Sequence, residues 1–276
     1  MMRALKKSGN HIFLMAYLLI ILFPFLFVIF SSLKLNNAEI ALNPFGLPKQ
    51  LKWENYVDAW VNAKINVYFF NSLYISVLSS TLTIVISSMV AFAVTRMRYK
   101  KISAIIFSIL LLGMLIPNTS LMLPIYLLLQ KIGVLNTHLA LIIPYVANAI
   151  PISAIIIAAF MRSLPAEVEE ASVIDGLSAK GIFVRIIMPL IGPAIVTVFI
   201  ISFLGNWNEF LLANYFLSND ALRTLPVGMV QFRDAKLSNY AQMSAGIVFC
   251  VVPVMLFYGL LQKQIIEGVT AGSVKG

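Results

Sequence analysis

The sequence predicts an all-α fold: a polytopic membrane helix bundle with six transmembrane helices and both termini in the cytoplasm. Hydrophobic residues make up 60% and charged residues 11% of the 276 residues, whereas a soluble domain has about 45–50% apolar and about 25% charged residues. So few charged groups cannot cover a surface that is solvated all round. In addition, six charge-free stretches are each long enough to cross the hydrocarbon core of a bilayer as a helix.

Each charge-free stretch is predicted to hold one span. The stretches are residues 12–33, 65–95, 102–130, 132–161, 186–208 and 237–262. The first is too long for a cleavable signal peptide and is followed by no small-residue cleavage site, so we expect it to be retained. Seven prolines lie in or beside the last four spans: Pro117, Pro124, Pro144, Pro151, Pro189, Pro193 and Pro253. They indicate either kinks around a pathway or the ordinary tolerance of membrane helices for proline.

The distribution of Lys and Arg predicts the orientation of the chain. An even number of spans places both termini on one side, and the segments on that side carry 12 of the 20 basic residues. The dense cluster Arg96–Lys101 weighs most, because short basic loops stay on the cytoplasmic side. The net charge of +9 is therefore interpreted as an orientation signal beside an anionic membrane and not as a nucleic-acid footprint.

We expect the chain to divide into three parts. Residues 1–64 comprise an N-terminal tail, the first span and an outside loop; residues 65–262 form a core of five helices with a cytoplasmic loop at 162–185; residues 263–276 are a C-terminal tail. The outside loop has a turn-rich stretch and the aromatic pair Trp53 and Tyr56, which fits a membrane interface.

The cytoplasmic loop at 162–185 has the features of a helix. Ser163 can cap it, Pro165 suits a first turn, and three glutamates follow where the helix dipole favours negative charge. Gly176 can end it in a left-handed conformation. The side chains of Val168, Ala171 and Ser172, at helical spacing, form one small face. A second helix is expected after Ser178. The loop helix is either simply solvated or a docking element.

The same loop carries a family resemblance. The order Glu170-Ala171-Ser172, three residues, Gly176, nine residues, Ile186, two residues, Pro189 resembles the EAA loop of binding-protein-dependent ABC importer permeases. Ser172 stands where that pattern has a second alanine, and Met188 where it usually has leucine. Three further segments are similar to the carbohydrate branch of this family, and the last two to its maltose-type second permease: residues 44–56, 206–212 and 268–276.

The resemblance implies the type I ABC importer permease fold and a set of partners. These are a second homologous permease in a heterodimer, two copies of a cytoplasmic ABC ATPase, and an extracytoplasmic sugar-binding protein. The loop would form the coupling helix that docks into the ATPase, through Glu167, Val168, Glu170, Ala171, Ser172, Asp175 and Gly176. The C-terminal tail would either insert between the ATPase subunits or be disordered.

Several chemistries are excluded by what the sequence lacks. It has no G-x-x-x-x-G-K-[ST] phosphate loop and no Gly-Lys dipeptide, so ATP and Mg are expected only on the partner ATPase subunits, and no cofactor on this chain. A single cysteine, Cys250, and two distant histidines predict neither a disulfide, a metal site nor a catalytic triad. No charged residue lies within the six stretches, which counts against an ion-coupled secondary carrier.

Polar residues near the spans are candidates for a substrate pathway. They are Asn118, Asn148, Asn206, Trp207, Asn208 and Glu209. Amides, a carboxylate and an indole suit a neutral sugar. The alternatives are hydrogen bonding between helices for Asn118 and Asn148, an interfacial position for Trp207, and a hydrated or loop-shaping role for Glu209.

The sequence therefore predicts a permease subunit, without enzymatic activity of its own, of an ATP-driven importer of sugars, expected to be oligosaccharides. It would lie in a bacterial or archaeal cell membrane and work by alternating access. The alternatives are an ABC permease for a non-sugar solute and a stand-alone secondary carrier or channel.

Overall fold

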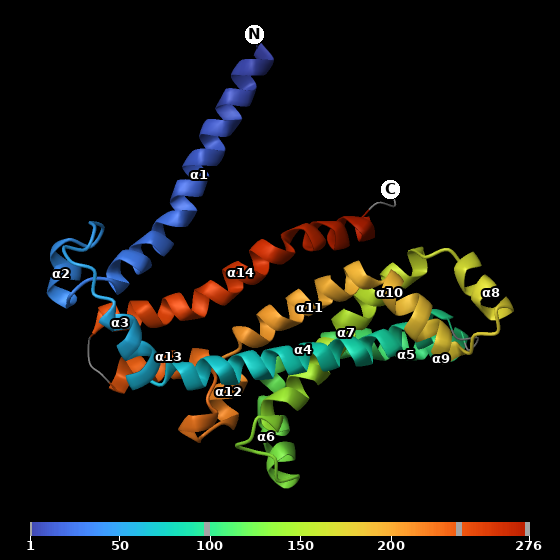
Figure 1. Ribbon diagram of the computed structural model, residues 1–276. Coiled ribbons are helices and arrows are strands. Elements are labelled where there is room, and N and C mark those ends of the chain that lie inside the picture. The colour runs from blue at the N-terminus through green and yellow to red at the C-terminus, as the bar shows by residue number, and fades with distance from the viewer. Residues whose placement is uncertain (1, 97–99, 236–238, 274–276) are drawn as a thin grey trace. The chain divides into compact units, whose positions relative to one another are not determined.

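The computed structural model describes residues 2–96, 100–235 and 239–273, and all regular secondary structure in these ranges is helical (Figure 1). The chain divides into two compact units. The first comprises Met1–Phe69 and Val227–Pro253, and the second comprises Phe70–Pro226 and Val254–Gly276. The predicted boundaries at residues 64 and 262 were drawn from the expected membrane spans, whereas the two units are defined by packing. The predicted division therefore stays a prediction.

Four long helices are apolar enough to cross a membrane. They are α1 (Met2–Ser32), α4 (Ile65–Arg96), α7 (Leu139–Ser163) and α14 (Tyr240–Ser273). Each covers most of one predicted stretch. The expected start of the last stretch at 237 lies outside the described residues. Helix α14 continues through the predicted tail as far as Ser273, and residues 274–276 again lie outside the described range.

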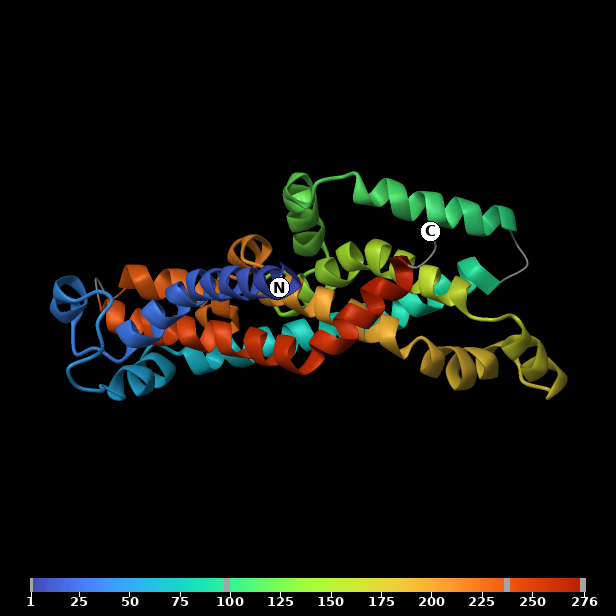
Figure 2. The same ribbon diagram turned by 90° about the horizontal axis from the view of Figure 1, so that it is seen from above.

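Two further predicted spans are broken helices. Helix α5 (Lys100–Met114) is followed by the short turn η2 (Asn118–Leu121) and α6 (Met122–Lys131), with a bend of 90° between the two halves. Figure 2 shows the corner where α5 and α6 meet. Pro117 is extended (φ −62°, ψ 130°) and has no N–H for a helical hydrogen bond, which accounts for the break. The stretch 102–130 is thus not the continuous helix that we expected.

The second break precedes α11. The chain passes through α9 (Ala179–Gly181), η3 (Ile182–Ile187) and α10 (Met188–Leu190) before it bends by 75° into α11 (Gly192–Trp207). Prolines flank the bend. The described residues therefore contain four spans, or six if each bent pair counts as one, so the predicted count of six stays within the range.

The fourth predicted stretch begins later than expected. It was expected from residue 132, but Gly133 has φ 73° and Asn136 has φ 59°, and these left-handed residues turn the chain between α6 and α7. Helix α7 starts only at Leu139. The absence of charge in a stretch does not reveal single residues with positive φ. The later start of α7 could therefore not be predicted from this pattern.

The core of the second unit joins α4, α7, η3 and α11. Its buried members are Ile84, Ala91, Ile157, Ala158, Met161, Ile182, Ile187, Ile191 and Val198. On α4 the inward side also carries buried small hydroxyl residues, among them Ser79, Ser80 and Thr83, which allow neighbouring helices to approach closely. This packing fixes α7 and α11 against α4, and these helices carry the candidate sites.

The first unit gathers the connection after α1 and the start of α14. The connection contains α2 (Asn37–Leu42), α3 (Glu54–Val57) and η1 (Asp58–Asn62). Gln242 on α14 donates to Asp58 at 2.9 Å, and the Trp60 and Phe249 rings lie 4.8 Å apart. The connection is therefore a folded part of this unit.

Candidate translocation and coupling sites

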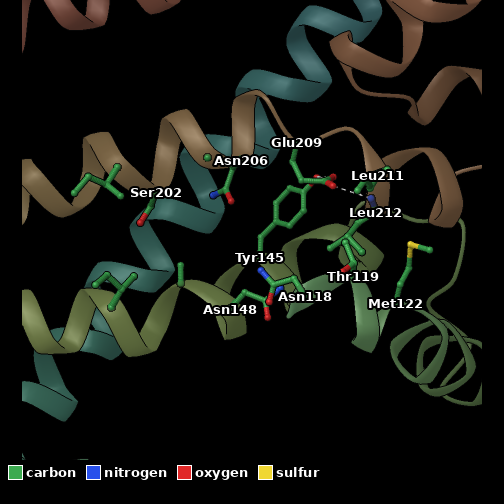
Figure 3. Close-up of a pocket in the computed structure, with 14 residues that line it drawn as sticks. Asn118, Thr119, Met122, Tyr145, Asn148, Ser202, Asn206, Glu209, Leu211 and Leu212 are labelled. Carbon is green, nitrogen blue, oxygen red and sulfur yellow. Dashed lines mark hydrogen bonds between the residues drawn. The ribbon is translucent and has the colours of Figure 1, made fainter. Parts of the chain in front are cut away.

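A cavity of about 270 Å³ lies in the second unit, between α7, α11 and the segment around η2. Its polar lining consists of Asn118, Thr119, Tyr145, Asn148, Ser202, Asn206 and Glu209, which Figure 3 shows around the space with Met122, Leu211 and Leu212. Known ligand pockets start at about 300 Å³ and combine apolar walls with a few polar groups. This cavity has that composition and lies at the lower limit of that size.

Helical spacing brings these side chains together. Tyr145 and Asn148 are three residues apart on α7, and Ser202 and Asn206 are four apart on α11, so each pair lies on one face of its helix. Asn118 follows the proline that breaks the helix after α5. The break exposes polar groups that a continuous span would have to place against lipid or a neighbouring helix.

Glu209 is held by three hydrogen bonds. Its Oε2 accepts from the Tyr145 hydroxyl at 2.6 Å and from the Ala213 N–H at 3.1 Å, and its Oε1 accepts from the Leu212 N–H at 2.7 Å. The two N–H groups belong to the first turn of α12 (Leu211–Phe216), which a carboxylate stabilises. Glu209 therefore ties α7 to α12, in agreement with the loop-shaping interpretation.

The cavity contains four of the six candidate pathway residues: Asn118, Asn148, Asn206 and Glu209. Trp207 is 2% exposed and stacks on Phe203, with ring centroids 5.7 Å apart, so it packs inside the chain and not at a membrane surface. Asn208 is exposed and donates to the Leu204 carbonyl at 2.8 Å. A direct contact of any of the six with substrate stays a prediction.

Three lining residues were missed by the sequence reasoning. Tyr145 and Ser202 lie one helical turn before the amides of Asn148 and Asn206, and a search for polar side chains at helical spacing would have found both. Thr119 is the neighbour of Asn118 in the sequence and lines the same cavity. The amides and hydroxyls together offer donors and acceptors in an apolar setting, which suits a neutral, hydroxyl-rich ligand.

The loop at 162–185, predicted to be cytoplasmic, contains α8 (Glu167–Ile174). Gly176 has φ 80°, its N–H donates to the Val173 carbonyl and that of Leu177 to the Ser172 carbonyl, both at 3.0 Å. These two bonds define a left-handed helix stop of the Schellman type. The predicted stop at Gly176 is confirmed.

The predicted start of this helix was wrong by a few residues. Ser163 is the last residue of α7, and its hydroxyl donates to the Phe160 carbonyl at 2.7 Å. Leu164 is extended (φ −73°, ψ 137°), as expected for a residue before proline, so Pro165 lies before α8 and not in its first turn. The N-cap position is Ala166, which has no capping side chain. The expected second helix starts after Ser178, whose hydroxyl oxygen accepts from the Gly181 N–H.

One side of α8 is bound to the rest of the unit. Glu169 forms an ion pair with Arg96 at the end of α4, with 2.6 Å between Oε1 and Nε, and the two side chains are 19% and 18% exposed. Arg96 also donates through Nη2 to the Met161 carbonyl on α7 at 2.6 Å. Ser172 is buried and donates to the Val168 carbonyl at 2.7 Å. Arg96 therefore connects α8 to the end of α4, and it connects the end of α4 to the end of α7.

The other side of α8 is exposed. It presents Glu167, Val168, Glu170, Ala171, Val173, Ile174, Asp175 and Gly176. Ser172 does not share a free face with Val168 and Ala171, contrary to our expectation, because it points into the unit. Val173 and Ile174, at 61% and 85% exposed, add an apolar surface that the sequence reasoning missed. An exposed helix with acidic and large apolar groups is suited to contact another protein.

The long and broken apolar helices, with a polar cavity between them, define a membrane protein of several spans. The chain belongs to the family described as binding-protein-dependent transport system inner membrane component, whose sequence profile matches residues 83–270. This confirms the family resemblance that the loop at 162–185 indicated, and it identifies the chain as a transport subunit in a multi-pass membrane location.

Several proteins are similar over nearly the whole chain. The probable ABC transporter permease protein YurM of Bacillus subtilis is 38% identical over 98% of this chain and 89% of its own length. The sulfoquinovosyl glycerol transport system permease protein SmoH of Agrobacterium fabrum is 34% identical over 98% and 95%. The diacetylchitobiose uptake system permease protein NgcG of Streptomyces coelicolor is 34% identical over 96% and 88%.

A solved structure shares the fold. A chain of a bacterial ABC transporter involved in the import of the acidic polysaccharide alginate superposes with a TM-score of 0.82 over 94% of this chain and 96% of that chain, at 21% identity. At this identity the likeness supports the fold alone, and it agrees with the predicted importer-permease architecture.

Proposed function

We propose that this chain is the permease subunit of an ATP-driven, binding-protein-dependent importer of sugars, with oligosaccharides as the expected substrates. It would form half of the translocation pathway and work by alternating access. The names of similar proteins support a sugar: besides the two above, a melibiose/raffinose/stachyose import permease and an arabinooligosaccharides permease are 31% and 32% identical to this chain.

One observation carries the proposal: a single helix, α7, runs from the cavity to the short segment that leads into the exposed α8. Helix α7 lines the cavity with Tyr145 and Asn148 and ends at Ser163, four residues before α8 begins. From Asn148 to Ser163 the rise is about 22 Å at 1.5 Å per residue. A displacement of α8 is therefore transmitted along α7 to the groups around the cavity.

The proposed partners follow from the exposed side of α8. We infer that Glu167, Val168, Glu170, Ala171, Asp175 and Gly176 contact a cytoplasmic ATPase, with Ser172 supporting them from inside. Two ATPase copies, a second homologous permease and an extracytoplasmic sugar-binding protein complete the assembly. ATP and Mg bind to the ATPase. Six spans with both termini in the cytoplasm are the topology consistent with α8 facing that subunit.

The experiment is isolation of the assembly through a tag on this chain, followed by mass spectrometry of its partners. The expected result is an ABC ATPase, a second permease and a solute-binding protein in one complex. In the purified complex, Glu170→Gln and Gly176→Ala are then compared with wild type for substrate-stimulated ATPase activity and uptake. Normal coupling in both variants would remove α8 from the proposed docking role.

A solute panel decides the substrate class. The isolated binding protein is screened by thermal shift against neutral mono- and oligosaccharides and, as controls, amino acids and small anions. Stabilisation by oligosaccharides supports the proposal. Stabilisation by a control solute alone would assign the chain to an importer of another substrate.

A further inference from the structure

The connection after α1 is tied tightly to the end of that helix. The Lys52 N–H donates to the Leu33 carbonyl at 3.0 Å, and the Asn55 side-chain amide donates to the carbonyls of Ser32 and Lys34, both at 2.9 Å. Asn55 and Lys34 are both 0% exposed. The connection is thus held in a defined position against the helix end.

Internal groups satisfy the polar backbone of the turn that follows α2. The buried Lys34 ammonium donates to the Asn43 carbonyl at 2.5 Å and the Pro44 carbonyl at 3.1 Å, and the Asn43 N–H donates to the Glu39 carbonyl at 3.1 Å. Pro44 and Pro48 have no N–H. In a turn exposed to water, water molecules can hydrogen-bond the carbonyl groups. A buried ammonium group is then unnecessary for this purpose, and burying it costs free energy. The arrangement suits a turn from which water is excluded.

The same turn exposes large apolar side chains. Leu42, Phe45, Leu47 and Leu51 are 86%, 62%, 70% and 57% exposed, and we call them the turn patch. Single exposed apolar residues are common, whereas a group of four within ten residues marks a contact with a membrane or another molecule.

The turn patch folds back along α1. The Phe45 ring lies 5.1 Å from the Phe23 ring and 5.8 Å from the Phe27 ring, between centroids. Phe27 and Phe23 precede the helix end at Ser32 by about 7 and about 13 Å at 1.5 Å per residue, so Phe45 lies about 10 Å down the helix. Figure 1 shows the connection beside this end of α1.

This depth corresponds to the membrane interface. The apolar part of α1, Asn10–Ser32, has 23 residues, or about 34 Å, against a hydrocarbon core of about 30 Å. Centring the helix puts Phe45 about 8 Å inside the hydrocarbon boundary. Interfacial segments insert their apolar face by about 5–10 Å.

We propose that the turn patch is a membrane anchor, inserted into the leaflet that receives the C-terminal end of α1. Lipid is its partner because the patch continues the apolar surface of α1, in whose most apolar 18-residue stretch no residue is buried within the chain, and on which Phe23 and Leu26 are 52% and 43% exposed. The exposed Lys49 lies between Leu47 and Leu51, and its long side chain allows the ammonium to reach lipid phosphates.

Spin labels test the anchor in the complete transporter complex, reconstituted in phosphatidylcholine–phosphatidylglycerol nanodiscs. The single cysteine is removed by Cys250→Ala, and labels are placed by Phe45→Cys or Leu47→Cys. Ile20→Cys, on the exposed side of α1, is the lipid control, and Ser218→Cys, on an exposed loop, is the aqueous control. Collision of each label with oxygen and with a soluble nickel chelate is measured by electron paramagnetic resonance.

The expected result is the behaviour of the lipid control at both turn positions, with high oxygen and low nickel collision. Nickel collision as high as at Ser218→Cys would show a turn in water. Low collision with both reagents would show that a protein subunit covers it. Either result overturns the proposal. Phe45→Cys removes the ring that contacts Phe23 and Phe27, whereas Leu47→Cys leaves it in place. If the two labels behave differently, the result at Leu47→Cys is therefore the decisive one.

Discussion

The ion pair between Arg96 and Glu169 gives the sharpest prediction about coupling. Arg96→Gln removes the 2.6 Å contact with Glu169 and the 2.6 Å hydrogen bond to the Met161 carbonyl. Exposed ion pairs contribute about 0.2–1 kcal/mol, and hydrogen bonds of charged groups about 1.5–3 kcal/mol. Because both side chains are about four-fifths buried, we expect a loss of about 1–2 kcal/mol. This is roughly a tenfold shift of α8 away from its attached position.

The assay is the number of sugar molecules transported per ATP hydrolysed by the complex in proteoliposomes. Arg96→Gln and Glu169→Gln should each lower this ratio severalfold while ATP hydrolysis continues, because a loosened α8 no longer moves α7. The double exchange Arg96→Glu with Glu169→Arg should restore part of it. Lys101→Gln, an exposed charge in the same basic cluster, is the matched control and should behave as wild type.

Unchanged ratios in both single variants would refute the role of the ion pair. A loss that the double exchange leaves uncorrected, with Lys101→Gln unaffected, would show that the individual side chains matter and their pairing does not. The double variant Arg96→Gln with Glu169→Gln completes a cycle with the two single variants, and the coupling free energy from that cycle isolates the contribution of the pair.

Three further predictions concern other parts of the chain. Tyr145→Phe removes the 2.6 Å hydrogen bond to Glu209. It should lower the stability of the purified complex by about 1–3 kcal/mol, measured as a lower Tm. An unchanged Tm would contradict a stabilising link between α7 and α12 through Glu209. Gly176→Ala adds about 1 kcal/mol or more of backbone strain at φ 80° without a steric contact, and hydrogen exchange at the end of α8 should increase, whereas unchanged protection would contradict a strained stop. The N–H groups of Lys49 and Leu35 hold the pKa of the Glu39 carboxyl below its ordinary value. Its stabilisation is thus present above the ordinary pKa and lost as the pH falls through the lowered one, so acid should increase hydrogen exchange of the α2 region in wild type but not in Glu39→Gln.

The spans and the helix α8 were predictable because their signals are local in the sequence. Charge-free stretches of the right length gave α1, α4, α7 and α14, and Gly176 marked the end of α8 by its conformational freedom. The breaks were harder to predict. Pro117 was recognised as a possible kink, but a 90° corner depends on how the two halves pack, which the apolar pattern does not encode.

Contacts between distant segments could not be predicted. Nothing in the sequence near Glu169 indicates Arg96, which is 73 positions earlier, or that Ser172 would face inward beside this pair. Glu209 and Tyr145 are likewise 64 positions apart. The amides of the cavity were predicted individually, as polar residues in or near the spans, whereas the convergence of Asn148 and Asn206 depends on the packing of α7 against α11.

Sugar uptake by proteoliposomes containing the tagged complex tests the central claim most directly. Labelled oligosaccharide identified by the binding-protein screen is supplied outside with that protein, and ATP or a non-hydrolysable analogue is enclosed with the ATPase side. The proposed function predicts accumulation with ATP, none with the analogue, and none in vesicles that contain this chain alone. Uptake by this chain alone, without ATP or partners, would contradict it and indicate a self-sufficient carrier or channel.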